Sequence, residues 1–208
     1  MTLTARVIRN ARKQGIIVYD RRQWGSNQLA TYQWRRVNRR HLQLPRKPTD
    51  TLVQHITVTR DDGPLPGNFF EDMQEVERIG MERFGTGFPY NWGIDFRTGE
   101  VGLGQSLDAA GAHTINEKNV PGFSENMNYT AIAFAMIGMP GQRLSAKAAH
   151  SMSVLMAAHI EEGALTLRHD YVPHSMFAAK SCPTENVRRR MATIQGNGRK
   201  IALTNMHR

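Results

Sequence analysis

Apolar residues recur along this 208-residue chain at the spacings of both strands and helices. Five segments rich in β-branched or aromatic residues are expected to be strands, at 51–59, 90–96, 100–103, 129–138 and 165–167. Four segments have helical spacing, at 2–14, 69–84, 145–162 and after Thr184. In the second helix the apolar positions are expected to form one core-facing stripe, made of Phe69, Met73, Val76, Gly80 and Phe84. Strands and helices mixed in this way are typical of an α/β domain.

Charge divides the chain unevenly. Residues 1–50 hold 12 of the 27 Lys and Arg residues and only two acidic residues, which gives a net charge of +10. Residues 51–208 hold 15 basic and 16 acidic residues, which gives −1. We therefore expect a basic N-terminal extension at 1–50 that leads into the domain, a main domain at 51–195 and a loose polar tail at 196–208. Within the extension, 32–47 is expected to be a basic connecting segment.

The basic extension favours an anionic partner such as nucleic acid, anionic lipid or a cell-wall polymer, although a solvated surface has the same composition. The sequence has no run of about 18 apolar residues and no secretory leader, so neither a membrane span nor export is expected. A chain of this length builds a core without disulfides, and synthesis in a reducing cytoplasm is expected.

Cys182 is the one cysteine of the chain, so it cannot form an intramolecular disulfide. It follows His174 by eight residues and Lys180 by two, which favours nucleophilic attack or metal ligation over simple packing. With His55, in the predicted strand at 51–59, these side chains supply the three ligands that a catalytic zinc site needs. His169 is the rival second ligand, and each of these residues taken alone has an ordinary structural explanation.

Several segments together resemble the type 2 N-acetylmuramoyl-L-alanine amidases, a family that includes amidase-type phage lysozymes and peptidoglycan recognition proteins. The segment around His55, 52–59, resembles the strand that carries the family's first zinc ligand. The further similar segments, in the family's order, are 22–25, 88–94, 98–101, 111–113, 131–138 and 174–183. The sequence departs from the family at Pro173 and Thr184, where glycine is common, and in its long basic N-terminal part.

The resemblance implies a single domain with a central mixed β-sheet flanked by helices and a zinc site in a groove on one face. It implies that His55, His174 and Cys182 bind Zn²⁺, and that the substrate is the amide between N-acetylmuramic acid and the L-alanine of the peptidoglycan stem. The remaining implied site residues are Tyr90 and Lys180 as catalytic groups and His113, Asn91 and Trp92 as substrate contacts. A lysine beside the metal can stabilise an oxyanion, and a tyrosine can orient water or relay a proton.

Other functions remain open from the sequence. The first is a recognition module that binds peptidoglycan without cutting it, and the second is a cysteine–histidine hydrolase. A third is a nucleic-acid-binding protein that stacks bases on Trp24, Tyr32 and Trp34, but it leaves the residues at 55–183 unexplained, so no nucleic-acid partner is expected. The leading hypothesis is a phage endolysin that stays in the host cytoplasm until another protein opens the membrane, with its basic extension in contact with anionic wall polymers.

Overall fold

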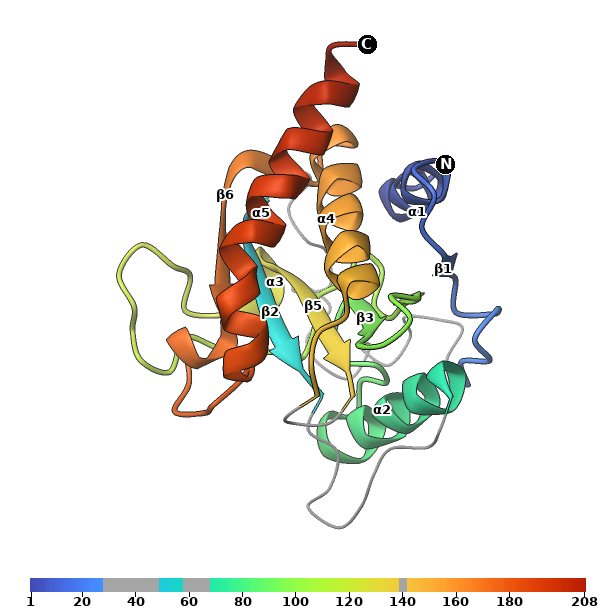
Figure 1. Ribbon diagram of the computed structural model, residues 1–208. Helices are drawn as coiled ribbons and strands as arrows, with labels where there is room; N and C mark the ends of the chain where they lie inside the picture. Colours follow the sequence, from blue (N-terminus) through green and yellow to red (C-terminus); the bar gives the residue numbers. More distant parts are fainter. Residues whose placement is uncertain (28–48, 58–67, 139–141) are drawn as a thin grey trace.

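A computed structural model describes residues 1–27, 49–57, 68–138 and 142–208 of the chain (Figure 1). Six strands form one mixed sheet in the order β1-β4-β3-β5-β2-β6, which confirms the predicted α/β fold. The strands are β1 (Val18–Tyr19), β2 (Thr49–Ile56), β3 (Trp92–Asp95), β4 (Val101–Leu103), β5 (Ile132–Ile137) and β6 (Leu165–Pro173). The helices are α1 (Leu3–Lys13), α2 (Phe69–Phe84), α3 (Met127–Thr130), α4 (Ala146–Glu161) and α5 (Glu185–Met206), with a 3₁₀ turn at His174–Met176.

Helices cover both faces of the sheet, and the alternation of β2 shows which residues face each layer. Leu52 and Ile56 belong to the main core, which they form with residues of α1, α4 and α5. Val53 points to the opposite face, where it packs with α3 and Phe177. On that same side α2 packs through Met73 and Val76 in a separate apolar cluster. Figure 1 shows α4 and α5 side by side across the sheet.

Most predicted elements are present with shifted ends. The predicted strands at 90–96 and 100–103 are β3 and β4, which pair antiparallel, and the predicted helix at 145–162 is α4, capped by the Ser145 side chain. The predicted strand at 165–167 extends to Pro173 as β6, an edge strand whose exposed polar residues weaken the apolar pattern. The predicted strand at 129–138 begins only at Ile132, because α3 occupies the preceding residues.

The described part of the N-terminal extension is not separate from the domain, which corrects the predicted boundary at residue 50. Val7, Ile8 and Ala11 of α1 are buried in the main core. Strand β1 then pairs with β4 at the edge of the sheet. The predicted connecting segment at 32–47 lies outside the described residues, so the structure does not test it.

The expected loose tail at 196–208 is wrong, because α5 continues to Met206. Gly196 and Gly198 have low helix propensity, but the tertiary packing of α5 outweighs this local preference. A Cβ atom at Gly198 would lie 3.0 Å from the carbonyl oxygen of Ser153 on α4, so glycine allows the two helices to approach closely. Ala202 is fully buried one turn further along. Within the described ranges, no helix is long and apolar enough to cross a membrane.

Candidate metal centre and active site

The pairing of β2 with β6 brings two histidines together. The strands are parallel, and their register pairs Gln54 with Pro173. His55 follows Gln54 within β2, and His174 directly follows Pro173, the last residue of β6, so their side chains meet at the carboxyl end of the pair. The two rings lie 4.5 Å apart between centroids, and both side chains are buried.

The chain after His174 folds back and places Cys182 beside these rings. The backbone nitrogen of Ser175 donates a hydrogen bond to the carbonyl oxygen of Cys182 at 2.6 Å, which closes the loop. The backbone nitrogen of Ile56 donates to the Cys182 sulfur at 3.3 Å. Potential ligand atoms of His55, His174 and Cys182 all lie within 4.8 Å of one another.

Burial keeps the histidines of this group neutral. Desolvation, together with the repulsion that a proton on His55 would meet from protonated His174 or His113 and from Lys180, holds the pKa of His55 well below its ordinary value. Desolvation and Lys180 lower the pKa of His174 to about 4. Neutral imidazoles keep the nitrogen lone pair that a metal ion requires, so both rings are ready to act as ligands at neutral pH.

The donor set fits a zinc ion. Zinc is held at about 2.0–2.3 Å by imidazole nitrogen and thiolate sulfur, which brings tetrahedral ligands to within about 4 Å of each other. Among the described residues, these two histidines and the cysteine are the one such group that could hold a metal, and zinc is consistent with it. In general, structural zinc sites have four protein ligands, whereas catalytic sites have three and leave one position open.

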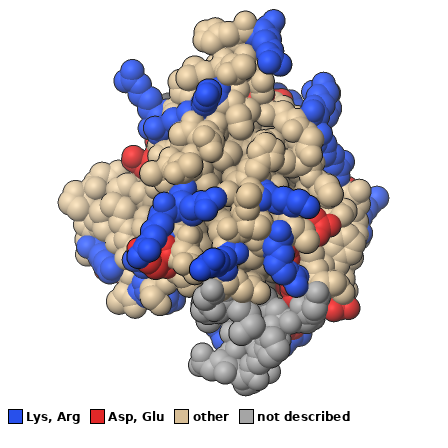
Figure 2. Space-filling view, viewed as in Figure 1, with Lys and Arg blue, Asp and Glu red and all other residues tan. Residues whose placement is uncertain are grey.

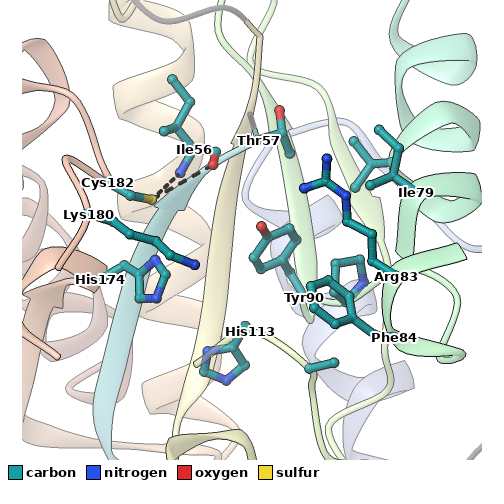
Figure 3. Close-up of a pocket in the computed structure, with 13 residues that line it drawn as sticks. Ile56, Thr57, Ile79, Arg83, Phe84, Tyr90, His113, His174, Lys180 and Cys182 are labelled. Carbon is teal, nitrogen blue, oxygen red and sulfur yellow. Dashed lines mark hydrogen bonds between the residues drawn. The ribbon is translucent and has the colours of Figure 1, made fainter. Parts of the chain in front are cut away.

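A cavity of about 160 Å³ lies next to the three side chains (Figure 3). Its lining includes the predicted residues His113, Tyr90 and Lys180. Figure 3 shows the Lys180 side chain extending into the cavity between His174 and Tyr90. A cation at this place can stabilise negative charge that develops on a substrate oxygen.

The chain before β3, which carries Tyr90, packs closely against α2, and the Tyr90 carbonyl accepts a hydrogen bond from the Gln105 backbone nitrogen at 2.7 Å. A methyl group at Gly80 would overlap the carbonyl oxygen of Gly87, so glycine lets the helix rest on this segment. The rings of Tyr90 and His55 lie 4.9 Å apart between centroids. Desolvation, together with the Cys182 sulfur, raises the pKa of Tyr90, and its hydroxyl therefore remains a proton donor at neutral pH.

His113 approaches the metal group from a different segment. Its Nδ1 lies 3.2 Å from His55 Nε2, so one ring nitrogen donates to the other. The backbone nitrogens of His113 and Thr114 both donate to the Asn128 side-chain oxygen, which fixes this turn. Burial and the His174 charge lower the pKa of His113 to about 3. The ring forms part of the cavity wall beside His55.

Two further lining residues, Arg83 and Phe84, were missed by the sequence analysis. The periodicity of α2 predicted Phe84 in the core, but its side chain is 53% exposed. Gly85 ends the helix in a left-handed conformation, so the last turn no longer follows the buried stripe. In the sequence, the only indication that this part of the helix lines a cavity was a charged and an aromatic residue next to each other in its final turn.

Trp92 and Asn91 do not lie in the cavity, and their prediction as substrate contacts is wrong. Trp92 is fully buried on the opposite side of the sheet, where its indole nitrogen donates to His159 at 2.9 Å. The Asn91 side chain accepts a hydrogen bond from the backbone nitrogen of Ala133 at 2.9 Å and donates toward Gln105 and Ser106. Both residues are structural because strand β3 begins at Trp92 and directs that indole into the main core.

The rival ligand His169 lies on β6, five residues before His174, and is not part of the group. Its Nδ1 bonds the carbonyl oxygen of Thr166, and its own carbonyl accepts from Gln195 and Arg199 of α5. Trp24, one of the three proposed base-stacking residues, is buried and donates to the Leu103 carbonyl. The other two, Tyr32 and Trp34, lie outside the described residues.

Comparison with known proteins supports the fold. No family model matches this sequence, and no curated protein matches it. The ectodomain complex of the peptidoglycan recognition proteins LCa and LCx bound to tracheal cytotoxin matches over 82% of this chain and 92% of that chain, with 19% identity and a TM-score of 0.61. Bumblebee PGRP-SA matches over 85% of this chain and 94% of that chain, with 17% identity and a TM-score of 0.65.

An endolysin has the same fold. The N-acetylmuramoyl-L-alanine amidase LysCS from Clostridium intestinale URNW matches over 71% of this chain and 84% of that chain, with 20% identity and a TM-score of 0.51. The chain thus has the fold shared by peptidoglycan recognition proteins and a type 2 amidase. On that fold it carries a buried group of two histidines and a cysteine that could hold a metal.

Proposed function

We propose that the protein is a zinc-dependent amidase that hydrolyses peptidoglycan at the bond between N-acetylmuramic acid and L-alanine of the stem peptide. The observation that carries this proposal is the group of His55, His174 and Cys182, with donor atoms within 4.8 Å, at the edge of a cavity on an amidase-type fold. Proteins with this fold include one bound to tracheal cytotoxin and one named as an amidase.

The residues around the cavity have complementary roles. Bound zinc supplies a water molecule of lowered pKa and polarises the amide carbonyl. Lys180 stabilises the negative charge on the carbonyl oxygen as the tetrahedral species forms. Tyr90 orients the attacking water through its protonated hydroxyl. His113 contacts the substrate beside His55.

The decisive experiment is digestion of purified peptidoglycan with and without a chelator. We expect new L-alanine amino termini, no new sugar reducing ends, and loss of the reaction when zinc is removed. The Cys182→Ser variant should be inactive, whereas Ser181→Ala, a change at the exposed neighbour, should retain activity. Reducing ends instead of amino termini would contradict the proposal, and chelator-resistant cleavage would favour a cysteine–histidine hydrolase.

The alternative is a recognition module that binds peptidoglycan fragments without cutting them. The similarity to recognition proteins supports this alternative. A complete group of three potential ligands favours the enzyme, because binding alone does not require a metal that activates water. Binding of a muropeptide without release of L-alanine amino termini, by protein loaded with zinc, would support the module.

We also propose that the enzyme serves as a phage endolysin, held in the host cytoplasm until a membrane lesion admits it to the wall. The similarity to LysCS, an endolysin, supports this role. Expression in bacteria tests it. Cells should lyse only when a separate membrane-permeabilising protein or solvent is added, and lysis by the enzyme alone would refute the proposed location.

Contact between the basic residues of 1–50 and anionic wall polymers also belongs to this proposal. In the described part of that segment, several cations already have intramolecular partners. Arg6 pairs with Glu162, and Arg12 donates to the Val18 carbonyl. Arg9, Lys13 and Arg22 carry the exposed charge that would be available to a polymer.

A further inference from the structure

Residues 51–208 have a net charge close to zero, but their negative and positive charges are concentrated in different parts of the chain. Residues 51–141 contain 5 Lys and Arg and 12 Asp and Glu, which gives a net charge of −7. Residues 142–208 contain 10 Lys and Arg and 4 Asp and Glu, which gives +6. The basic part includes α4 and α5, so the fold gathers these charges on one layer of the molecule.

Figure 2 shows Lys and Arg side chains spread over the face that α4 and α5 present. A groove of about 270 Å³ runs between these two helices. Lys200, Arg190 and His150 line it, and Lys147 is exposed beside it on the first turn of α4. We call this surface, with the polar lining residues Thr193 and Asn197, the α4–α5 face.

The cationic side chains of this face form no salt bridge with another described residue. Lys147, Arg190 and Lys200 are exposed and make no ion pair there, and no Asp or Glu lines the groove. On α5, Arg190, Thr193, Asn197 and Lys200 follow one another at spacings of three and four, so they lie on one side of the helix. Charge and hydrogen-bond donors are therefore aligned along one line, which suits the repeated anions of a polymer.

The α4–α5 face lies across the sheet from the catalytic cavity. Leu52 packs in the main core with α4 and α5, whereas α2 and His113, which line the cavity, lie on the other side. A ligand on this face would leave the cavity open. The surface therefore fits a polymer that holds the enzyme near its substrate without competing for the cavity.

The lining of the groove distinguishes among phosphate-bearing partners. Apart from His150, no aromatic side chain lines it, so nucleic-acid bases would find no stacking partner. Its two isoleucines, Ile194 and Ile201, are buried or half-buried, so it offers no large apolar side chain for insertion into a bilayer. Hydroxyl and amide donors beside cations suit a sugar or polyol chain joined by phosphodiesters.

We propose that the α4–α5 face binds a phosphodiester-linked anionic polymer of the bacterial cell wall and thereby anchors the enzyme on the wall. The choice of a wall polymer rests on the proposed function. The basic face itself does not depend on catalysis, because no residue that lines its groove also lines the catalytic cavity.

The test is co-sedimentation with isolated cell walls that retain their phosphodiester polymers, and with the same walls after acid extraction of those polymers. A chelator prevents digestion. The face variant is Lys147→Gln/Arg190→Gln/Lys200→Gln, and the control variant is Arg9→Gln/Lys13→Gln/Arg22→Gln, which removes the same charge from exposed N-terminal sites. Cleavage of a soluble muropeptide by each variant is measured separately.

We expect the face variant to bind native walls at least about tenfold more weakly at low salt, with the dependence of log affinity on log salt reduced by about 2 for three lost phosphate contacts. The control should lose clearly less affinity than the face variant, because the N-terminal cations add only a secondary contact with the polymer, and extracted walls should bind all three proteins weakly. Muropeptide cleavage by the face variant should be unchanged. The binding measurement does not depend on catalysis. An inactive wild-type protein would therefore refute the proposed amidase activity, and the result for polymer binding could still be interpreted.

Three results would overturn the inference. The first is an equal or larger loss of binding in the control variant, which would assign wall contact to total charge or to the N-terminal segment. The second is undiminished binding of the wild type to extracted walls. The third is stronger binding to duplex DNA or anionic vesicles than to native walls at equal phosphate concentration, lost in the face variant.

Discussion

The sulfur of Cys182 accepts a hydrogen bond from the backbone nitrogen of Ile56 at 3.3 Å, and Ile56 directly follows His55 on β2. One candidate ligand is therefore attached to the strand that carries another, although 126 positions separate Cys182 from Ile56 in the sequence. Burial raises the pKa of the Cys182 thiol, while the Ile56 N–H and the Lys180 charge lower it. A bound metal ion would remove the remaining proton, since coordinating thiols are deprotonated.

Substitution of Cys182 by serine should weaken zinc binding by more than about 100-fold, because loss of a direct ligand costs more than loss of the groups that orient ligands. The buried position also means that the fold must be checked by circular dichroism. Zinc affinity can be measured by competition with a chromophoric chelator. The matched control Ser181→Ala should bind zinc as the wild type does, and a similar loss in that variant would speak against Cys182 as a ligand.

Removal of zinc should lower the thermal stability of the protein. A ligand present at about 1,000 times its dissociation constant stabilises the native state by about 4 kcal/mol, which in a chain of this size corresponds to roughly 10 °C in melting temperature. Calorimetry with and without excess zinc measures the shift. The shift should be much smaller in Cys182→Ser, and an equal shift in both proteins would place the bound zinc elsewhere.

Tyr90→Phe should lower kcat by about 100-fold or more, the usual size of a lost proton-transfer or orienting contribution. The Tyr90 ring lies 4.9 Å from that of His55 between centroids and is not among the potential metal ligands, so zinc content should be unchanged. Peptidoglycan turnover together with metal analysis separates the two effects. A variant that loses both activity and zinc would show that Tyr90 supports the metal group instead of the reaction.

The sequence predicted the central elements well because their apolar pattern is continuous. Strand β5 is buried at all six residues, and α4 has a capping serine and a mostly buried length. Strand β6 was underestimated because an edge strand has exposed polar residues, and pairing with β2 defines its length. The C-terminal half of α5 was missed because glycine has a low helix propensity, so Gly196 and Gly198 indicated the end of a helix. The structure shows that Gly198 allows α5 to approach α4 closely.

The site could be predicted in part. The order and spacing of residues suggested His55, His174 and Cys182, but the residues alone did not exclude His169. The register that pairs Gln54 with Pro173 resolves this ambiguity, since it places His174 beside His55. Trp92 was misplaced because the predicted strand started two residues early, and periodicity alone does not fix where a strand begins.

Asp72 on α2 should make stability depend on pH in a direction opposite to that of the buried histidines. Its side chain is 3% exposed, one carboxylate oxygen has no partner, and the other lies 3.9 Å from Arg97. Desolvation raises its pKa to about 6, despite the Arg97 charge, with help from Asp95 and Glu71. Protonation therefore favours the folded state, and this contribution is lost as pH rises from about 4 through 6.

Asp72→Asn mimics the protonated form, so the variant should exceed the wild type in unfolding free energy by ~3 kcal/mol at pH 7, with the difference vanishing below pH 4. Urea unfolding between pH 4 and 7.5 measures it. Asp108→Asn, a change at an exposed carboxylate outside this cluster, is the matched control for loss of one negative charge. A constant difference for Asp72→Asn would show that the carboxyl group titrates normally.

His159 and Trp92 form a buried pair that should contribute pH-dependent stability and no substrate binding. The His159 Nε2 accepts from the Trp92 indole, and its Nδ1 donates to the Leu155 carbonyl at 2.6 Å, so the neutral ring is fully satisfied. Burial lowers the pKa of His159 to about 4. Because the folded pKa is below the unfolded one, the stability is complete above about pH 6.5 and is lost as pH falls to 4.

In the variant His159→Phe, the Trp92 N–H has no acceptor, which should cost about 1–3 kcal/mol at pH 7. The difference in unfolding free energy between the two proteins should shrink by ~3 kcal/mol between pH 7 and 4. The wild type is destabilised over this range because folding keeps His159 neutral at a pH where it would be protonated in the unfolded chain, and the variant has no such group. Urea unfolding of both proteins in chelator checks the gap. The KM for a muropeptide should be the same in both proteins. A higher KM in the variant, with unchanged stability, would support the original prediction that Trp92 contacts the substrate.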